Sequence, residues 1–128
     1  MTERDLHKFT LDLLRNSARR GVLYLHIPNG VQSKDGARAG RWQVAMGMRR
    51  GAADWLIVMN GKAGFLELKR PATEGNKRGE QNIWQRIFEG DAKEAGALYA
   101  VARTPEEVES ILYKWGAIKK VEMPRRAA

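Results

Sequence analysis

Two short apolar runs with a tight turn between them lie at the centre of this chain. Trp55–Met59 is apolar at every position, which is typical of a strand buried in the middle of a sheet. Asn60-Gly61 is a strong signal for a hairpin turn, and Phe65–Lys69 follows as a second strand, which Pro71 ends. This hairpin predicts that the chain is built around a central sheet.

The segments on both sides of the hairpin complete an α/β pattern. The expected elements are, in chain order, a helix over Glu3–Arg19, a strand over Val22–Ile27, a short helix near Arg41–Met46, the hairpin, a helix over Glu80–Ala95, a strand over Ala97–Ala102 and a helix from Thr104-Pro105 to about Gly116. This order predicts one α/β layer sandwich over residues 1–118, followed by a short basic tail over residues 119–128.

The composition supports a folded single domain. The chain has 128 residues, 43% of them hydrophobic and 30% charged, which allows a real core beneath a well-solvated surface. Cysteine is absent, so disulfides and thiolate metal sites are excluded. No apolar stretch is long enough to span a membrane, and Met1–Asp5 lacks the features of a signal peptide. We therefore expect a soluble, intracellular protein.

The net charge of +8 favours a polyanionic partner, because each Lys or Arg that meets a phosphate releases a counterion. A basic surface kept for solubility is the alternative. Membrane binding is disfavoured, since no segment pairs a basic face with exposed large apolar residues. The residues expected to contact DNA are Arg15, Arg19, Arg38, Arg41, Arg49, Arg50, Lys77 and Arg78.

Glu67 and Lys69 stand out in the second strand of the hairpin. Because side chains alternate along a strand, both share one face with Phe65. Burying a carboxylate costs several kcal/mol unless the group is paired or coordinates a metal. The two charges are explained by a solvated strand face, by an ion pair along the strand, or by a site that needs them.

Asp54, directly before the first strand, favours a site. If the hairpin loop is Gly61-Lys62, Asp54 lies opposite Lys69 and is a diagonal neighbour of Glu67, about 7–8 Å away. A slip of one residue would move Asp54 to the other face. Two carboxylates at one end of a strand pair suit Mg²⁺ or Mn²⁺, and no soft ligand competes for another metal.

The order of several short motifs resembles the VRR-NUC (virus-type replication-repair nuclease) domain of the PD-(D/E)xK nuclease superfamily. The matching segments are Pro28-Asn29-Gly30, Ala45-Met46-Gly47, Gly51-Ala52-Ala53-Asp54, Phe65-Leu66-Glu67-Leu68-Lys69-Arg70, Glu80-Gln81 and Gly96-Ala97. The resemblance runs from Glu3 to about Trp115. One departure is Ala53, where the superfamily often has Pro. The resemblance implies a restriction-endonuclease-like core, with a mixed central sheet flanked by helices.

The resemblance also implies roles for individual residues. Asp54 and Glu67 would hold the metal, with the Leu68 carbonyl as a further oxygen ligand. Lys69 would orient the attacking water and balance charge on the phosphate. Glu3 would complete the metal site, although an acid in the first turn of a helix is also favoured by the helix dipole.

Gln81 is a further candidate for the catalytic site. It precedes Trp84 by three residues, which would place its amide on the inner face of the helix. The alternative is an ordinary polar residue at the start of a helix. The residues expected to form the inner face are Ile83, Trp84, Ile87 and Phe88.

The function that the resemblance implies is a Mg²⁺- or Mn²⁺-dependent endodeoxyribonuclease that leaves a 5′-phosphate and a 3′-hydroxyl. Small stand-alone members of the family often come from phages, so the expected setting is the cytoplasm of a bacterial or phage-infected cell. We further expect a homodimer that cuts branched DNA such as four-way (Holliday) junctions. The rivals are a module of the same fold that binds nucleic acid without cutting it, and a basic domain that binds an acidic protein.

Overall fold

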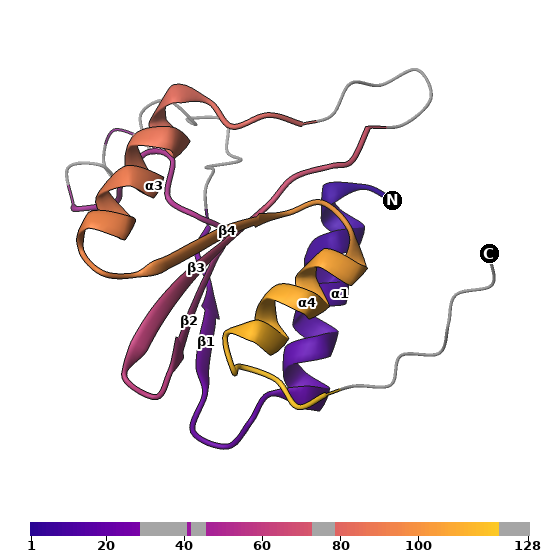
Figure 1. Ribbon diagram of the computed structural model, residues 1–128. Helices are drawn as coiled ribbons and strands as arrows, with labels where there is room; N and C mark the ends of the chain where they lie inside the picture. Colours follow the sequence, from indigo (N-terminus) through magenta and orange to yellow (C-terminus); the bar gives the residue numbers. More distant parts are fainter. Residues whose placement is uncertain (29–40, 42–45, 73–78, 121–128) are drawn as a thin grey trace.

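The computed structural model describes residues 1–28, 41, 46–72 and 79–120, and it confirms a mixed α/β fold (Figure 1). The elements are α1 (Glu3–Ser17), β1 (Leu23–His26), β2 (Trp55–Met59), β3 (Lys62–Leu68), α3 (Ile83–Glu94), β4 (Leu98–Ala102) and α4 (Pro105–Lys114). Most of the short helix expected near Arg41–Met46 lies outside the described residues, as do Arg38, Lys77 and Arg78.

The four strands form one mixed sheet in the order β1-β2-β3-β4. β1, β2 and β3 are antiparallel neighbours, and β4 runs parallel to β3 after the crossover through α3. In Figure 1, α1 and α4 lie together on one side of the sheet and α3 lies on the other. The sheet is therefore flanked by helices on both faces, as expected, and β1 and β4 are its edges.

The hairpin register differs from the expected one. The turn residues are Asn60 and Gly61, both with positive φ (52° and 75°), so β2 and β3 pair Trp55 with Leu66. Two successive positive φ angles are what a type I′ hairpin turn requires. The correction shifts the pairing by two residues, which leaves every side chain on its expected face. Asp54 now continues the register opposite Glu67 rather than Lys69.

Helix α1 begins as its sequence predicts and ends earlier. The Thr2 hydroxyl and the Asp5 side chain form a reciprocal capping box. The helix ends at Ser17, and the Arg19 N–H donates to the Ala117 carbonyl. Arg19 is therefore bound to the segment after α4, and the prediction that the helix continues to Arg19 was wrong.

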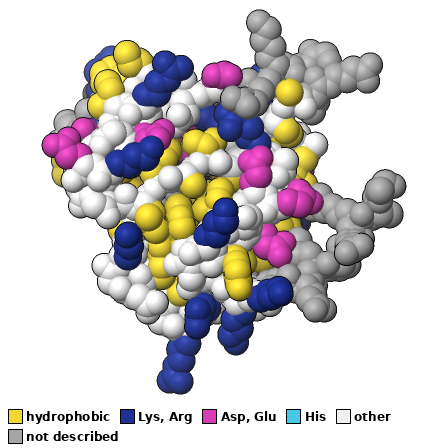
Figure 2. Space-filling view, in the orientation of Figure 1, with side chains coloured by type: hydrophobic (Ala, Val, Ile, Leu, Met, Phe, Trp, Pro, Cys, Tyr) yellow, Lys and Arg dark blue, Asp and Glu magenta, His cyan; other side chains and the backbone are white. Residues whose placement is uncertain are grey.

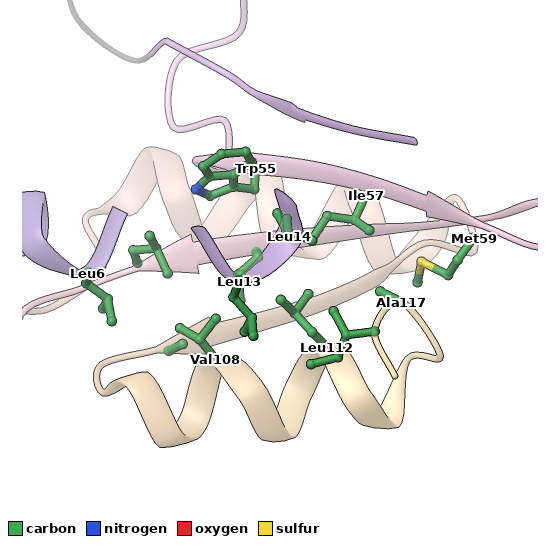
Figure 3. Packing of buried hydrophobic residues seen from close by; sticks show 13 residues of the cluster. Leu6, Leu13, Leu14, Trp55, Ile57, Met59, Val108, Leu112 and Ala117 are labelled. Carbon is green, nitrogen blue, oxygen red and sulfur yellow. The ribbon is translucent and has the colours of Figure 1, made fainter. Parts of the chain in front are cut away.

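The main core lies between the sheet and the α1–α4 layer. Leu14, Ile57 and Leu112 are fully buried there, one from each of the three contacting elements. Figure 3 shows these side chains pointing toward one another, together with Leu6, Leu13, Trp55, Met59, Val108 and Ala117. A smaller cluster on the α3 side contains Ala52, Ala53, Phe88 and Ala92.

Helix α3 differs from its expected position in both its start and its inner face. It begins at Ile83, where Asn82 and Gln85 form the capping box. Phe88 and Ala92 are buried, whereas Ile83, Trp84 and Ile87 are 67%, 48% and 45% exposed. The expected inner face was therefore correct only at Phe88. Over the described ranges, no helix is both long and apolar enough to cross a bilayer.

Candidate active site

Asp54 and Glu67 meet where β2 begins and β3 ends. Asp54 is fixed from both sides: its carbonyl accepts from the Ile27 N–H at 2.7 Å, and its Oδ2 accepts from the Leu68 N–H at 2.7 Å. The Leu68 main chain therefore lies at the site while its side chain is in the core. The two strands thus hold the Asp54 carboxylate beside that of Glu67.

The Glu67 side chain is buried, with 2% exposure, and only one of its oxygens is well satisfied. Oε1 accepts from the Gln85 amide at 3.1 Å and lies 3.7 Å from Lys69 Nζ. Oε2 is inaccessible to solvent and has no hydrogen-bond partner in the part of the chain that the structure describes. A buried oxygen of this kind indicates that a further donor or cation belongs there.

The electrostatics of the site point the same way. The pKa of Glu67 is raised from 4.5 to about 8, mainly by burial and next by the neighbouring Asp54 carboxylate, whose effect exceeds the opposing effect of Lys69. Without a cation, the two carboxyl groups are therefore held together most readily when Glu67 keeps its proton. A divalent cation would replace that proton and remove the repulsion.

The donor set fits Mg²⁺ or Mn²⁺. Carboxylate oxygens are the ligands that these hard cations prefer, and the orphaned Glu67 Oε2 beside Asp54 offers a coordination position. Among the described residues, no group of three or more His, Cys, Asp or Glu side chains converges to hold a metal. This suits a site in which one or two carboxylates are completed by water and by substrate phosphate, as is usual for Mg²⁺.

Helix α1 contributes side chains at the rim of this site. The exposed Glu3 accepts from the Arg70 N–H at 3.3 Å, directly after the strand that carries Glu67. One helical turn further, His7 Nε2 lies 3.7 Å from Asp54 Oδ1. Glu3 was expected near this site and His7 was not, although its spacing of four residues after Glu3 places both on one face of the helix.

Gln81 and Gln85 occupy different surroundings. The Gln81 amide precedes the helix and donates to Glu89 at 3.1 Å and to the Tyr99 hydroxyl at 3.0 Å. Gln85 is the glutamine whose amide reaches Glu67. The sequence feature that could have identified Gln85 is its spacing. It lies three residues before the buried Phe88, which places both residues on one face of the helix.

The described arginines of the expected DNA-binding set lie in several places. Arg15 is in the last turn of α1, at the end away from Glu3. Arg49 pairs with Asp91 at 2.9 Å, and the Arg50 guanidinium lies over the Trp84 ring. Arg41 is exposed. Figure 2 shows Lys and Arg side chains spread over the visible face with acidic side chains among them. On that face, the positive charge does not form one patch.

This is an α/β protein with two carboxylates and a lysine at one end of its central strand pair, and a solved structure has a similar fold. A solved structure named "VRR_NUC domain protein" superimposes with a TM-score of 0.68 at 16% sequence identity, covering 94% of this chain and 98% of that one. No protein-family model matches the sequence, and no curated protein matches it either. The chain therefore shares the fold of that VRR_NUC domain protein over nearly its whole length, consistent with the expected PD-(D/E)xK core.

Proposed function

We propose that this protein is a metal-dependent endonuclease that hydrolyses phosphodiester bonds in DNA. The observation that carries the proposal is the buried Glu67 carboxylate, with Asp54 beside it and Lys69 Nζ at 3.7 Å. A structural ion pair would leave no second carboxylate against Glu67 and no orphaned oxygen. A phosphodiesterase needs this combination of acids and a cation, because the reaction develops negative charge at a phosphate.

Each residue of the site has its own proposed role in the reaction. Asp54 and Glu67 would hold Mg²⁺ or Mn²⁺, with the Leu68 carbonyl as a further oxygen ligand. Glu3, whose carboxylate accepts from the Arg70 N–H in this structure, would join them only by turning from that position. A bound cation of this type polarises the phosphate and lowers the pKa of a bound water. Lys69 would orient the attacking water and balance charge on the phosphate oxygens. The Gln85 amide holds the Glu67 carboxylate in position at 3.1 Å.

We further propose that the protein acts as a homodimer on branched DNA such as four-way junctions. One domain with one such site cuts one strand, and two-fold symmetry would present two sites to two strands. The outward row of Ile83, Trp84 and Ile87 on α3 supports a second copy as partner, because apolar side chains gathered on one face mark interaction surfaces. The net charge of +8 favours recognition by shape and phosphate contacts.

The test is cleavage of linear, flap, forked and four-way DNA in Mg²⁺, Mn²⁺ or EDTA. The wild type is expected to cut in either metal and not in EDTA. Asp54→Asn, Glu67→Gln and Lys69→Ala should each lower the rate at least about a hundredfold, since the first two weaken the hold on the cation and the third removes the positive charge that balances the phosphate. DNA binding and the circular dichroism spectrum should remain close to wild type.

Glu94→Gln is the matched control, because it makes the same change at the last residue of α3, in an exposed position. Its cleavage rate should equal that of the wild type. Near-normal cutting by Glu67→Gln would refute the proposed site. DNA binding by the wild type without cleavage of any substrate in either metal would favour the rival, a binding module of the same fold.

A further inference from the structure

A groove of about 710 Å³ lies between the first half of α1 and the edge strand β1. α1 contributes Arg4, His7 and Lys8 to its lining, and β1 contributes Tyr24 and His26. Its volume is within the range of pockets that hold small organic ligands, about 300–1,000 Å³. None of these five residues has a part in the metal site proposed above.

The groove opens directly beside the candidate active site. His7 Nε2 lies 3.7 Å from Asp54 Oδ1, and His26 Nδ1 lies 2.9 Å from the Asp54 carbonyl oxygen. Both imidazoles therefore contact Asp54 on one side and line the groove on the other. A group that occupies the groove is a neighbour of whatever Asp54 helps to bind.

The walls of the groove are aromatic. His7 and His26 stand edge to face with their centroids 5.1 Å apart, and the His26 ring is 5.5 Å from that of Trp55. Tyr24 is half-buried and lies on the same strand face as His26. Trp55 also lines the groove, is 4% exposed, and its buried Nε1 has no hydrogen-bond partner among the described residues. Trp55 Nε1 is inaccessible from the groove, so the surfaces that match the faces of a nucleobase are the flat π systems of Tyr24, His7 and His26.

The rim of the groove is basic. Arg4 and Lys8 are exposed and lie one turn apart on α1, so both can reach a phosphate at the groove mouth. Glu3 is an acid in the lining, at the end nearest the candidate metal site. A peptide strand added to the β1 edge would need apolar or acidic side chains here. A nucleotide uses both the aromatic rings and the two cations.

We propose that this groove binds an unpaired nucleotide of the DNA substrate, next to the phosphate that is cut. The inference rests on the proposed nuclease function and adds to it a substrate class: DNA with an unpaired base beside the scissile bond, as at a flap or at a branch point whose bases have opened. Duplex DNA keeps its bases stacked and cannot fill the groove. Stacking on aromatic side chains tolerates any base, so the groove selects structure rather than sequence.

The test measures binding in EDTA, where no cleavage is needed. A flap duplex carries fluorescent 2-aminopurine as its first unpaired nucleotide, and a fully paired duplex of the same sequence serves for comparison. Wild-type protein should quench the flap probe and bind it more tightly than the paired duplex. Tyr24→Leu should restore most of the fluorescence and weaken flap binding at least about fivefold, because it removes a stacking surface. Lys8→Gln, on an exposed position that does not risk the fold, should also reduce the preference for the flap.

Tyr113→Leu and Lys114→Gln are matched controls on exposed positions of α4, outside the groove, and should leave the preference unchanged. Tyr24→Phe keeps the ring and should keep the quenching. An unquenched wild-type probe would overturn the inference, as would groove variants that weaken flap and duplex binding equally. Groove variants that change the mass in solution but not the DNA preference would assign the groove to a second copy and also overturn it. Quenching without any cleavage in Mg²⁺ would refute the nuclease and leave the groove supported.

Discussion

At the scale of single residues, the burial of Glu67 beside Asp54 favours a bound proton or cation at this position. Its carboxyl is buried, faces Asp54, and is only partly compensated by Lys69, so its pKa is raised to about 8. In the unfolded chain the same group has its ordinary pKa near 4.5. Because the folded pKa is the higher of the two, protonation of Glu67 stabilises the fold. This contribution is fully present below about pH 4.5 and is lost as the pH rises through 8.

We therefore expect the metal-free protein to lose thermal stability between pH 5 and pH 8, and Glu67→Gln to lose much less of it. The variant carries no charge at this position, so its Tm at pH 8 in EDTA should exceed that of the wild type by several degrees. Added Mg²⁺ should reverse the order by stabilising only the wild type, and its apparent affinity should rise up to about tenfold per pH unit in this range. Thermal scans with and without Mg²⁺ measure both effects. Identical pH profiles for the two proteins in EDTA would contradict the assignment.

At the scale of elements, the segment before β2 is packed against the first turn of α3. Gly51 has φ of +77°, and a Cβ at this position would lie 2.3–2.5 Å from backbone atoms of Trp84 and Gln85. Ala52 and Ala53 continue the contact into the smaller core cluster beside Phe88. This contact fixes the distance between Asp54, at the end of the segment, and the Gln85 amide that holds Glu67.

Gly51→Ala should therefore disturb both stability and catalysis. Any residue with a Cβ costs about 1–2 kcal/mol at a left-handed φ, and here the Cβ must also displace helix backbone. Gly61→Ala is the matched control, with φ of +75° and open space around it. We expect Gly51→Ala to lose clearly more stability in urea titrations than Gly61→Ala, and to cut DNA more slowly while Gly61→Ala remains near wild type. Equal losses in both variants would show that the contact with α3 has no special role.

At the scale of the whole molecule, the two sides of the sheet are covered unequally. α1 and α4 together bury one face, whereas α3 packs mainly on β4. At the opposite edge of the sheet, two apolar side chains of β1 are exposed, Leu23 by 60% and Leu25 by 43%. Together with the outward apolar row of α3, these positions leave hydrophobic area available to a second copy of the chain.

If a second copy docks on α3, Ile87→Glu should convert the dimer into a monomer, because it places a charge in an apolar interface. Tyr113→Glu makes a similar change at an exposed position of α4 and should leave the mass unchanged. Light scattering gives the mass. A cruciform plasmid reports paired incisions as linear product, and the Ile87→Glu protein should release only nicked circles. A wild-type protein that is monomeric and only nicks the plasmid would refute the dimer proposal without affecting the cleavage chemistry.

The sequence alone determined those features that depend on neighbouring residues. Trp55–Met59 forms β2 with the predicted bounds, α1 begins at Glu3, and Pro105 begins α4. The shared face of Asp54, Glu67 and Lys69 was also predictable, because a shift of two residues in the hairpin preserves the alternation of side chains. Local conformational preferences and strand periodicity are sufficient for each of these.

Only the tertiary structure decided how distant segments meet. It placed Asp54 opposite Glu67, selected Gln85 rather than Gln81 to hold Glu67, and turned Trp84 outward. It also brought His7 to the Asp54 carboxylate and the strand residue His26 to the Asp54 main-chain carbonyl, and it opened a groove beside them. The physical reason is that these contacts join elements far apart in the chain, so they follow from how helices pack on a sheet and not from any local pattern.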